Sequence, residues 1–185
     1  VFFGDAATEE GAVWESLNFS ALKKLPIIFV CENNFYSVCS SIHVRQPNVE
    51  IFKKAESFGM KSVQVDGCNV LDVFEATQDA VNFAREGKGP RFIESIAYRW
   101  RGHGGAGDDS ASGYRDLSEV AHWQEYCPIE LLDSYLFEKG FIDSQAKELM
   151  AQEIKLEIKE AFNHAISSPN PEEKDLYSFV YSEAT

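Results

Sequence analysis

The feature that most limits the possible folds of this chain is a repeated alternation of short apolar runs with longer helical patterns. The run PIIFVC at residues 26–31 is continuously apolar and rich in β-branched residues, which is typical of a parallel strand buried on both faces. Further strand-like runs occur at residues 1–3, 61–67 and 91–100. Helical patterns separate them, at residues 8–24, 49–59 and 70–87. Because such alternation produces βαβ units with right-handed crossovers, we expect an α/β fold with a doubly wound, mostly parallel sheet.

The character of the sequence changes after a Gly-rich loop, RGHGGAGDDSASG, at residues 101–113. Residues 128–140 and 143–168 both have helical patterns, and Asp143 is a suitable N-cap for the second. The chain is therefore expected to contain an α/β domain over residues 1–116. A C-terminal helical extension over residues 117–185 is expected to pack on that domain or on a partner.

Charge and composition exclude several classes of function. Acidic residues outnumber basic ones by 30 to 17, so the net charge of −13 argues against nucleic acid or an anionic membrane as the main partner. No apolar run approaches the roughly 20 residues that span a bilayer. The four cysteines form no C-x-x-C pair, so we expect reduced thiols in a cytoplasmic protein rather than a zinc site. Because the chain opens in a strand-like run without a signal peptide, we also expect that an upstream portion exists.

Oxygen-bearing side chains follow two of the expected strands. Gly4-Asp5 ends the first strand and Asn33-Asn34 ends the second. Ligands of doubly wound sheets bind at the carboxyl ends of strands, so both loops should open on one crevice. A magnesium ion there would combine one carboxylate and one amide oxygen with a phosphorylated ligand, and a helix beginning near Ala7 would direct its amides at the phosphate. Each piece alone is far more often an ordinary turn than a metal site, and only the combination makes the metal site specific.

The spacing of these two pieces leads to a family resemblance. Gly-Asp-x, then 26 residues, then Asn-Asn matches the fingerprint of thiamine-diphosphate enzymes. The stretch GDAATEEGAVWESLNFSALKKLPIIFVCENNFYSV resembles the alpha subunit of the dehydrogenase component of 2-oxo acid dehydrogenase complexes, the group of the pyruvate, branched-chain and acetoin enzymes. The resemblance continues through VDGCNVLDVFEA, GKGPRFIE, YRWRGH, DDSASGYR and CPIELL. It implies a thiamine-diphosphate-binding fold of the diphosphate-binding type, and it covers only the carboxyl-terminal portion of such a subunit.

The resemblance also implies roles for individual residues. The side chains of Asp5 and Asn34 and the backbone carbonyl of Tyr36 would bind Mg²⁺. The other implied contacts with thiamine diphosphate come from Ala6, Ala7, Arg99 and His103. Of these, His103 would lie over the reacting carbon as the catalytic residue, since imidazole has a reference pKa of about 6.5 and exchanges protons near neutrality.

The activity implied by the resemblance is that of a heterotetrameric oxidoreductase. Such an enzyme decarboxylates a 2-oxo acid, for example pyruvate, on thiamine diphosphate and transfers the acyl group to a lipoyl domain. The implied partners are a beta subunit, a lipoyl-bearing acyltransferase and a small 2-oxo acid. Without the N-terminal part of the subunit and without a beta subunit, we expect the chain to be inactive. Two alternatives stay open: another thiamine-diphosphate enzyme of transketolase or decarboxylase type, or a non-catalytic binding or scaffold subunit.

Three departures from the family pattern are visible in the sequence. Ala6 replaces a usual Gly and is compatible with the site only if its φ is negative, because a side chain disfavours positive φ. Gly104 stands where animal pyruvate enzymes carry a regulatory Ser, so kinase control at that position is not expected. Arg101 replaces a second His found in many relatives.

Several other polar residues receive structural interpretations. Asp108 and Asp109 are expected to be solvated or to contact Arg115 rather than to form a second metal site. The remaining histidines are interpreted as surface or structural residues; they are His43, His122 and His164.

Overall fold

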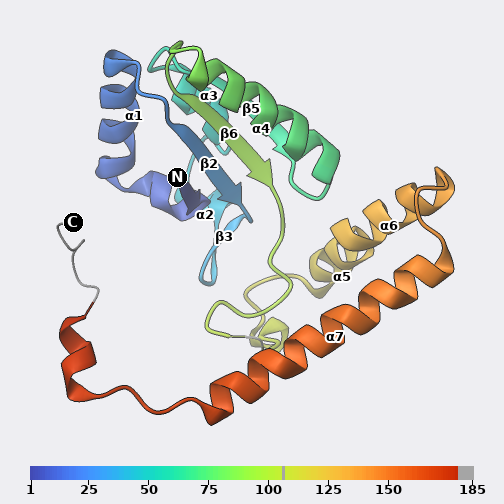
Figure 1. Ribbon diagram of the computed structural model, residues 1–185. Coiled ribbons are helices and arrows are strands. Elements are labelled where there is room, and N and C mark those ends of the chain that lie inside the picture. Colours follow the sequence, from blue (N-terminus) through green and yellow to red (C-terminus); the bar gives the residue numbers. More distant parts are fainter. Residues whose placement is uncertain (106, 179–185) are drawn as a thin grey trace. The chain divides into compact units, whose positions relative to one another are not determined.

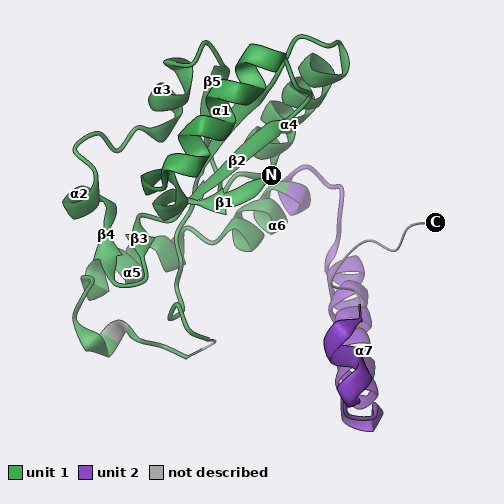
Figure 2. Ribbon diagram, turned by 90° about the vertical axis from the view of Figure 1, so that its left-hand side faces the viewer, with its two compact units in different colours: residues 1–135 green, residues 136–185 purple. Residues whose placement is uncertain are grey.

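The computed structural model describes residues 1–105 and 107–178 (Figure 1). It divides into two compact units, residues 1–135 and residues 136–185 (Figure 2). The units divide after Tyr135, whereas the sequence led us to expect a domain boundary after residue 116. Ala106 of the Gly-rich loop and residues 179–185 of the expected extension lie outside the described residues.

A four-stranded parallel sheet forms the centre of the first unit. Its strands are β1 (Phe2–Gly4), β2 (Ile28–Asn33), β5 (Lys61–Asp66) and β6 (Arg91–Ile96), in the spatial order β1-β2-β6-β5. Each neighbouring pair is parallel, with Gly4 opposite Glu32 and Cys31 opposite Glu94. The predicted parallel sheet is confirmed, and all four strands end at the same edge.

Helices connect these strands and cover both faces of the sheet (Figure 1). They are α1 (Gly11–Lys23), α3 (Ile51–Glu56) and α4 (Val70–Arg85). Leu17 of α1 and Ile51 of α3 share a fully buried core with Phe92 of β6. The neighbouring Arg91 has its side chain on the opposite face, because side chains alternate along a strand. There it stacks on Phe83 of α4, with 5.0 Å between the guanidinium carbon and the ring centroid. The doubly wound arrangement is therefore confirmed.

The segment after β1 differs from its expected conformation. The sequence predicted a helix beginning near Ala7, but Asp5–Glu9 forms the 3-10 turn η1 and the α-helix begins at Gly11. The hydroxyl of Thr8, which is buried, donates to the carbonyl of Asp5 at 2.6 Å, so a side chain satisfies one backbone group of this turn. The turn keeps the backbone after Asp5 at the edge of the sheet instead of carrying it directly into a long helix.

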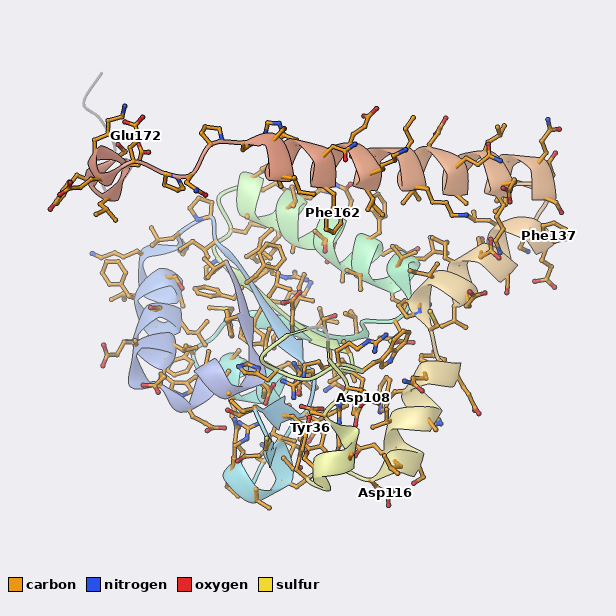
Figure 3. All side chains as sticks on the ribbon, turned by 90° about the horizontal axis from the view of Figure 1, so that it is seen from below. Tyr36, Asp108, Asp116, Phe137, Phe162 and Glu172 are labelled. Carbon is orange, nitrogen blue, oxygen red and sulfur yellow. The ribbon has the colours of Figure 1, made fainter. Side chains whose placement is uncertain are left out.

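Four short elements and one longer helix of the described chain were not predicted. A hairpin of β3 (Tyr36–Ser37) and β4 (Ser40–Ser41) leads into α2 (Ile42–Arg45). Helix α5 (Leu117–Glu125) begins after its N-cap Asp116, which accepts a hydrogen bond from the amide of Ser118 at 2.7 Å (Figure 3). A 3-10 turn, η2 (Ser110–Ser112), precedes it. These elements surround the strand ends and supply much of the site described below.

The C-terminal part of the described chain is helical, as the sequence predicted. It contains α6 (Pro128–Glu138), α7 (Ser144–Ser167) and the 3-10 turn η3 (Glu173–Tyr177). Asp143 caps α7 by accepting a hydrogen bond from the amide of Ala146 at 2.8 Å, which confirms the expected N-cap. The apolar stripe of α7 is exposed within the described chain, including Phe162 (Figure 3). None of the described helices is long and apolar enough to cross a membrane.

Candidate diphosphate and metal site

Asp5 lies at the carboxyl end of β1 with only 1% of its surface exposed. Its carboxylate forms an ion pair with Arg45, the last residue of α2, and the same guanidinium contacts the carboxylate of Glu9. A carboxylate so deeply buried is stable as an anion only when a cation or hydrogen bonds compensate it. The end of β1 is therefore a place where this fold brings a negative oxygen and a positive partner together.

The turn after β2 holds Asn34 and Tyr36 in a specific conformation. The side-chain oxygen of Asn34 accepts a hydrogen bond from the amide of Tyr36 at 3.0 Å, and that of Asn33 accepts from the amide of Phe35 at 3.0 Å. Phe35 has a φ of 69°, in the left-handed region that bulky residues rarely adopt. Its carbonyl accepts from the amide of Ile42 at 2.7 Å. Two side-chain bonds and one backbone bond thus hold a conformation that costs energy, a feature often found at functional sites.

The register of the sheet brings these two segments to one edge. Gly4 pairs with Glu32, so the residues that follow each strand leave the sheet side by side. Asp5 and the turn containing Asn34 therefore border the same region, as the sequence predicted from the strand ends. Ala6 has a negative φ, because the described non-glycine residues with positive φ are Lys24, Phe35 and Val38. The condition for accepting Ala6 in place of Gly is met.

A fully buried carboxylate supports the Asn33–Asn34 turn from within the sheet. Glu94 of β6 is 0% exposed and accepts hydrogen bonds from the Asn33 side-chain amide at 2.7 Å, the Phe52 backbone amide at 3.0 Å and the Gln64 side-chain amide at 3.2 Å. The sequence analysis missed Glu94. Its only signal was a charged residue inside the apolar strand RFIESI.

Arg99, which follows β6, contacts His103 of the Gly-rich loop. The Nη1 of Arg99 lies 3.0 Å from the Nδ1 of His103, and its Nη2 donates to the carbonyl of Val38 at 2.7 Å. Since a guanidinium can only donate, Nδ1 of His103 is the acceptor and the ring proton is assigned to Nε2. His103 is exposed and borders a hollow of about 230 Å³ within the Gly-rich loop. Arg99 therefore joins the β3–β4 hairpin to the loop and fixes the tautomer of the histidine.

The Gly-rich loop is held mainly through Asp109 and Arg115. The Nη2 of Arg115 lies 3.0 Å from Oδ1 of Asp109 and also donates to the carbonyl of Trp100 at 3.0 Å. This confirms the interpretation of Asp109 as a partner of Arg115. Asp108 lies in the same loop (Figure 3).

Aromatic residues form the wall between the hairpin and α5. The ring of Tyr36 makes edge contacts with Tyr98 and Tyr114, at centroid distances of 6.1 and 5.7 Å (Figure 3). Its hydroxyl donates to Glu119 of α5 at 2.7 Å. Burial and this hydrogen bond to a carboxylate together raise the pKa of Tyr36 well above its ordinary value, so its hydroxyl stays protonated. Tyr98 also stacks on Trp123 at 5.4 Å.

A largely apolar hollow of about 370 Å³ lies along this wall. Its lining includes Gly67, Ala97, Tyr98, Trp100 and Trp123. Because Gly67 follows β5 and Ala97 follows β6, the hollow opens at the same edge of the sheet as Asp5 and Asn34. The sequence analysis missed this wall because it did not predict α5.

Potential metal ligands are sparse at this edge. Among residues 1–105 and 107–178, no three His, Cys, Asp or Glu side chains are grouped so that they could hold a metal ion. A metal at Asp5 would consequently need amide, backbone and ligand oxygens to complete its coordination. The other three histidines, His43, His122 and His164, are exposed.

Comparison with protein families decides which group this site belongs to. The model of the family described as "Dehydrogenase E1 component" matches residues 1–174. The chain belongs to this family. The resemblance inferred from the sequence motifs is thereby confirmed, and it extends over almost the whole chain.

Comparison with individual proteins gives the same result as the family model. The chain is 36% identical over 182 residues to the pyruvate dehydrogenase E1 component subunit alpha of Porphyra purpurea, covering 98% of this chain and 52% of that protein. It is 39% identical over 183 residues to the chloroplastic pyruvate dehydrogenase E1 component subunit alpha-3 of Arabidopsis thaliana, covering 98% of this chain and 42% of that protein. It is 34% identical over 182 residues to the 2-oxoisovalerate dehydrogenase subunit alpha of Bacillus subtilis, covering 98% of this chain and 54% of that protein. The chain thus spans about half the length of these relatives.

Solved structures give only a distant likeness. A transketolase from Campylobacter jejuni superposes with a TM-score of 0.46 and 20% identity, covering 51% of this chain and 14% of that one.

Proposed function

We propose that this E1 family member is the diphosphate- and metal-binding part of the alpha subunit of a thiamine-diphosphate-dependent 2-oxo acid dehydrogenase. Family membership and the names of the relatives support the proposal. The observation that carries it is the buried carboxylate of Asp5, which lies at the carboxyl edge of the sheet beside the Asn34 turn and is paired with a cationic side chain.

The residues at this edge fit a hydrated or phosphate-bound magnesium ion. The guanidinium of Arg45 shows that the surroundings of Asp5 accept a positive charge. Asp5 offers a carboxylate, Asn34 an amide oxygen and Tyr36 a backbone carbonyl. This set is typical of Mg²⁺ that also binds phosphate oxygens. The backbone amides of Ala6 and Ala7, in the first turn of η1, are the proposed donors to the diphosphate, since the first amides of such a turn have no partner within it.

Thiamine diphosphate, when bound, would supply the electron sink for decarboxylation of a 2-oxo acid. The protein's own contribution includes proton transfer by His103. Arg99 donates to Nδ1 of this histidine, so Nε2 carries the ring proton and is the nitrogen that donates in the proposed proton transfer. Arg99 also contacts the hydroxyl of Tyr114 at 3.2 Å. In the proposed site, Nη1 of Arg99 contacts the histidine. The positive charge of the same guanidinium would attract the phosphate groups of the cofactor.

The complete activity and its partners belong to the same proposal. A beta subunit, assembled as a heterotetramer, would complete the cofactor site. The acyl group would pass to a lipoyl-bearing acyltransferase, and the substrate would be a small 2-oxo acid such as pyruvate. The proposed location is the cytoplasm, although the relatives include chloroplastic subunits.

Calorimetric titration tests this function. Thiamine diphosphate with Mg²⁺ is titrated into the chain, with and without a beta subunit, and into three variants. Asp5→Asn removes the charge of a metal ligand and is expected to weaken cofactor binding at least about tenfold, as loss of groups supporting a metal commonly does. Asp72→Asn makes the same change at an exposed position of α4 and should bind normally. Tyr36→Phe should also bind normally, because the proposed ligand is its backbone carbonyl.

The wild-type result separates the competing functions. Binding that requires the beta subunit, followed by acyl transfer to a lipoyl domain, supports the dehydrogenase. An absence of heat in both wild-type titrations would instead support a binding or scaffold subunit without cofactor. Binding without any dependence of activity on a lipoyl domain would support a transketolase- or decarboxylase-type enzyme.

A further inference from the structure

Arg45 is held between two carboxylates of the η1 turn. Its Nη2 pairs with Oδ2 of Asp5, and its Nη1 pairs with Oε1 of Glu9. Its Nε donates to the carbonyl of Ser40 at 3.1 Å. The side chain is 10% exposed, whereas that of Glu9 is 37% exposed. One guanidinium thus pairs with both carboxylates of the turn that the proposed function assigns to the diphosphate, and it offsets half of their charge.

The backbone that carries Arg45 is anchored on both sides. Ile42, three residues before it, is fully buried in the core, and Gln46, directly after it, is 7% exposed. The side-chain Nε2 of Gln46 donates to Oγ1 of Thr8 at 3.0 Å and to Oε1 of Glu9 at 3.1 Å. Two consecutive side chains from this segment therefore bind the η1 turn. Arg45 is a fixed part of this arrangement rather than a mobile surface side chain.

Cationic side chains around the turn are few in the described chain. Lys54 contacts the side-chain oxygen of Gln46 rather than a carboxylate of the turn. Burial lowers the pKa of Lys54, against the opposing effect of Glu94 and Glu9. Among the described ion pairs, only those of Arg45 engage Asp5 and Glu9. The balance of charge at η1 depends mainly on this one residue.

The charge of Arg45 has opposite consequences for a cation and for a phosphate. Beside Asp5 it repels a divalent metal that would bind the same carboxylate. It also reduces the repulsion between a diphosphate and the two carboxylates. Its contact with Asp5 uses Oδ2, and no hydrogen bond among the described residues uses Oδ1. A metal can bind Oδ1 while Arg45 stays in place.

We propose that Arg45 is an electrostatic positioning residue: it makes the η1 turn selective for a metal-bound diphosphate over a free divalent cation. It does so by offsetting half of the charge of Asp5 and Glu9 and by orienting the Asp5 carboxylate through Oδ2. This inference rests on the proposed function, since it concerns the same site.

The test measures two affinities whose expected changes have opposite signs. Mn²⁺ alone is titrated into the chain, together with a beta subunit if the wild type requires one, and free Mn²⁺ is followed by electron paramagnetic resonance. Thiamine diphosphate is titrated separately by calorimetry at saturating Mg²⁺. Arg45→Met is expected to bind Mn²⁺ several-fold more tightly and thiamine diphosphate roughly tenfold more weakly, because a full charge is removed beside both ligands. Arg45→Lys, which keeps the charge, should lie closer to the wild type in both titrations.

Two further variants exclude simpler explanations. Arg85→Met removes an exposed arginine from the end of α4 and should change neither affinity. Glu9→Gln removes one exposed carboxylate and should act in the reverse direction, with weaker Mn²⁺ binding and tighter diphosphate binding. Because Glu9 is at the surface, this variant keeps the test decisive even if Arg45→Met fails to fold.

The outcomes distinguish this inference from the function on which it rests. If the wild type binds neither ligand, with or without the beta subunit, both fail. If it binds both, and Arg45→Met and Glu9→Gln each weaken both affinities or change neither, the proposed function stands and the role of Arg45 is refuted. Opposite changes in the two affinities, reversed in Glu9→Gln, support it.

Discussion

Glu94→Gln tests whether the buried carboxylate of β6 supports the strand ends from which the site is built. Glu94 is fully buried and accepts three hydrogen bonds, at 2.7 Å from Asn33, 3.0 Å from Phe52 and 3.2 Å from Gln64. The substitution keeps the shape of the side chain but replaces one acceptor oxygen with an NH₂ group. At least one donor then faces another donor around a side chain that is fully buried.

The geometry restricts how the protein can adjust to this change. If the new amide keeps its oxygen toward Phe52 and Gln64, the side-chain NH₂ of Asn33 loses its acceptor. If the Asn33 amide flips to compensate, its oxygen leaves the amide of Phe35, which it now accepts at 3.0 Å. Either way one buried polar group is unsatisfied, which costs about 1–3 kcal/mol. The two remaining bonds each weaken by about 1 kcal/mol because their acceptor is no longer charged.

One effect opposes this loss. A neutral amide no longer carries the desolvation cost of a buried charge. Taking the opposing effects together, we expect a loss of about 2–3 kcal/mol in the free energy of unfolding. For a chain of this size that corresponds to a fall of roughly 4–12 °C in the midpoint of thermal unfolding.

Urea denaturation followed by tryptophan fluorescence measures this difference. The three tryptophans, Trp14, Trp100 and Trp123, all lie in the first unit, so the signal reports on the sheet rather than on α7. Glu32→Gln is the matched control, because Glu32 is exposed on the adjacent strand β2 and its substitution should change stability by less than about 0.5 kcal/mol. If Glu94→Gln were as stable as the wild type or more stable, the desolvation cost would outweigh the three hydrogen bonds and the reasoning would be wrong.

Two further predictions concern packing and reactivity. Gly67→Ala would place a Cβ 2.4 Å from Oγ of Ser95 and 2.5 Å from a backbone carbonyl oxygen, so urea denaturation should show a loss of about 1–3 kcal/mol. Gly4→Ala, whose Cβ would meet nothing nearer than 4.0 Å, is the control, and equal losses in both variants would contradict the argument. Burial, and after it nearby carboxylates, raise the pKa of the Cys31 thiol far above its ordinary value, so Cys31 stays a thiol at pH 8. Peptide mass spectrometry should find exposed Cys39 alkylated by iodoacetamide and Cys31 unmodified until the protein unfolds; labelling of both at equal rates would refute this.

Much of the architecture could be predicted from short-range patterns. The run PIIFVC indicated a strand because a strand buried on both faces must be apolar at every position. Gly59 and Gly87, the last residues of two predicted helical segments, adopt φ values of 74° and 70°. Such a left-handed residue is a common way to end a helix, and glycine adopts it without strain. Each of these signals lies within one element, so the sequence alone carries it.

Elements without a strong periodic signal were missed. The β3–β4 hairpin and α2 are too short for a repeat of apolar residues to appear. Phe35 at a φ of 69° contradicts its intrinsic preference. Its conformation depends on the hydrogen bond that its amide donates to the Asn33 side chain and on the one that its carbonyl accepts from Ile42. Local propensity cannot predict a turn that tertiary contacts impose.

The sequence by itself determined the parallel α/β fold, the family, and the placement of Asp5 and Asn34 after consecutive strands. Only the tertiary structure decided which charges compensate one another. Arg45 is 40 residues from Asp5, and Glu94 is 61 residues from Asn33. These pairs form because the crossovers of the sheet bring distant segments to one edge, and no local pattern encodes that proximity. A buried charge is stable only when an opposite charge or hydrogen bonds compensate it, and only the folded chain determines which residue does so.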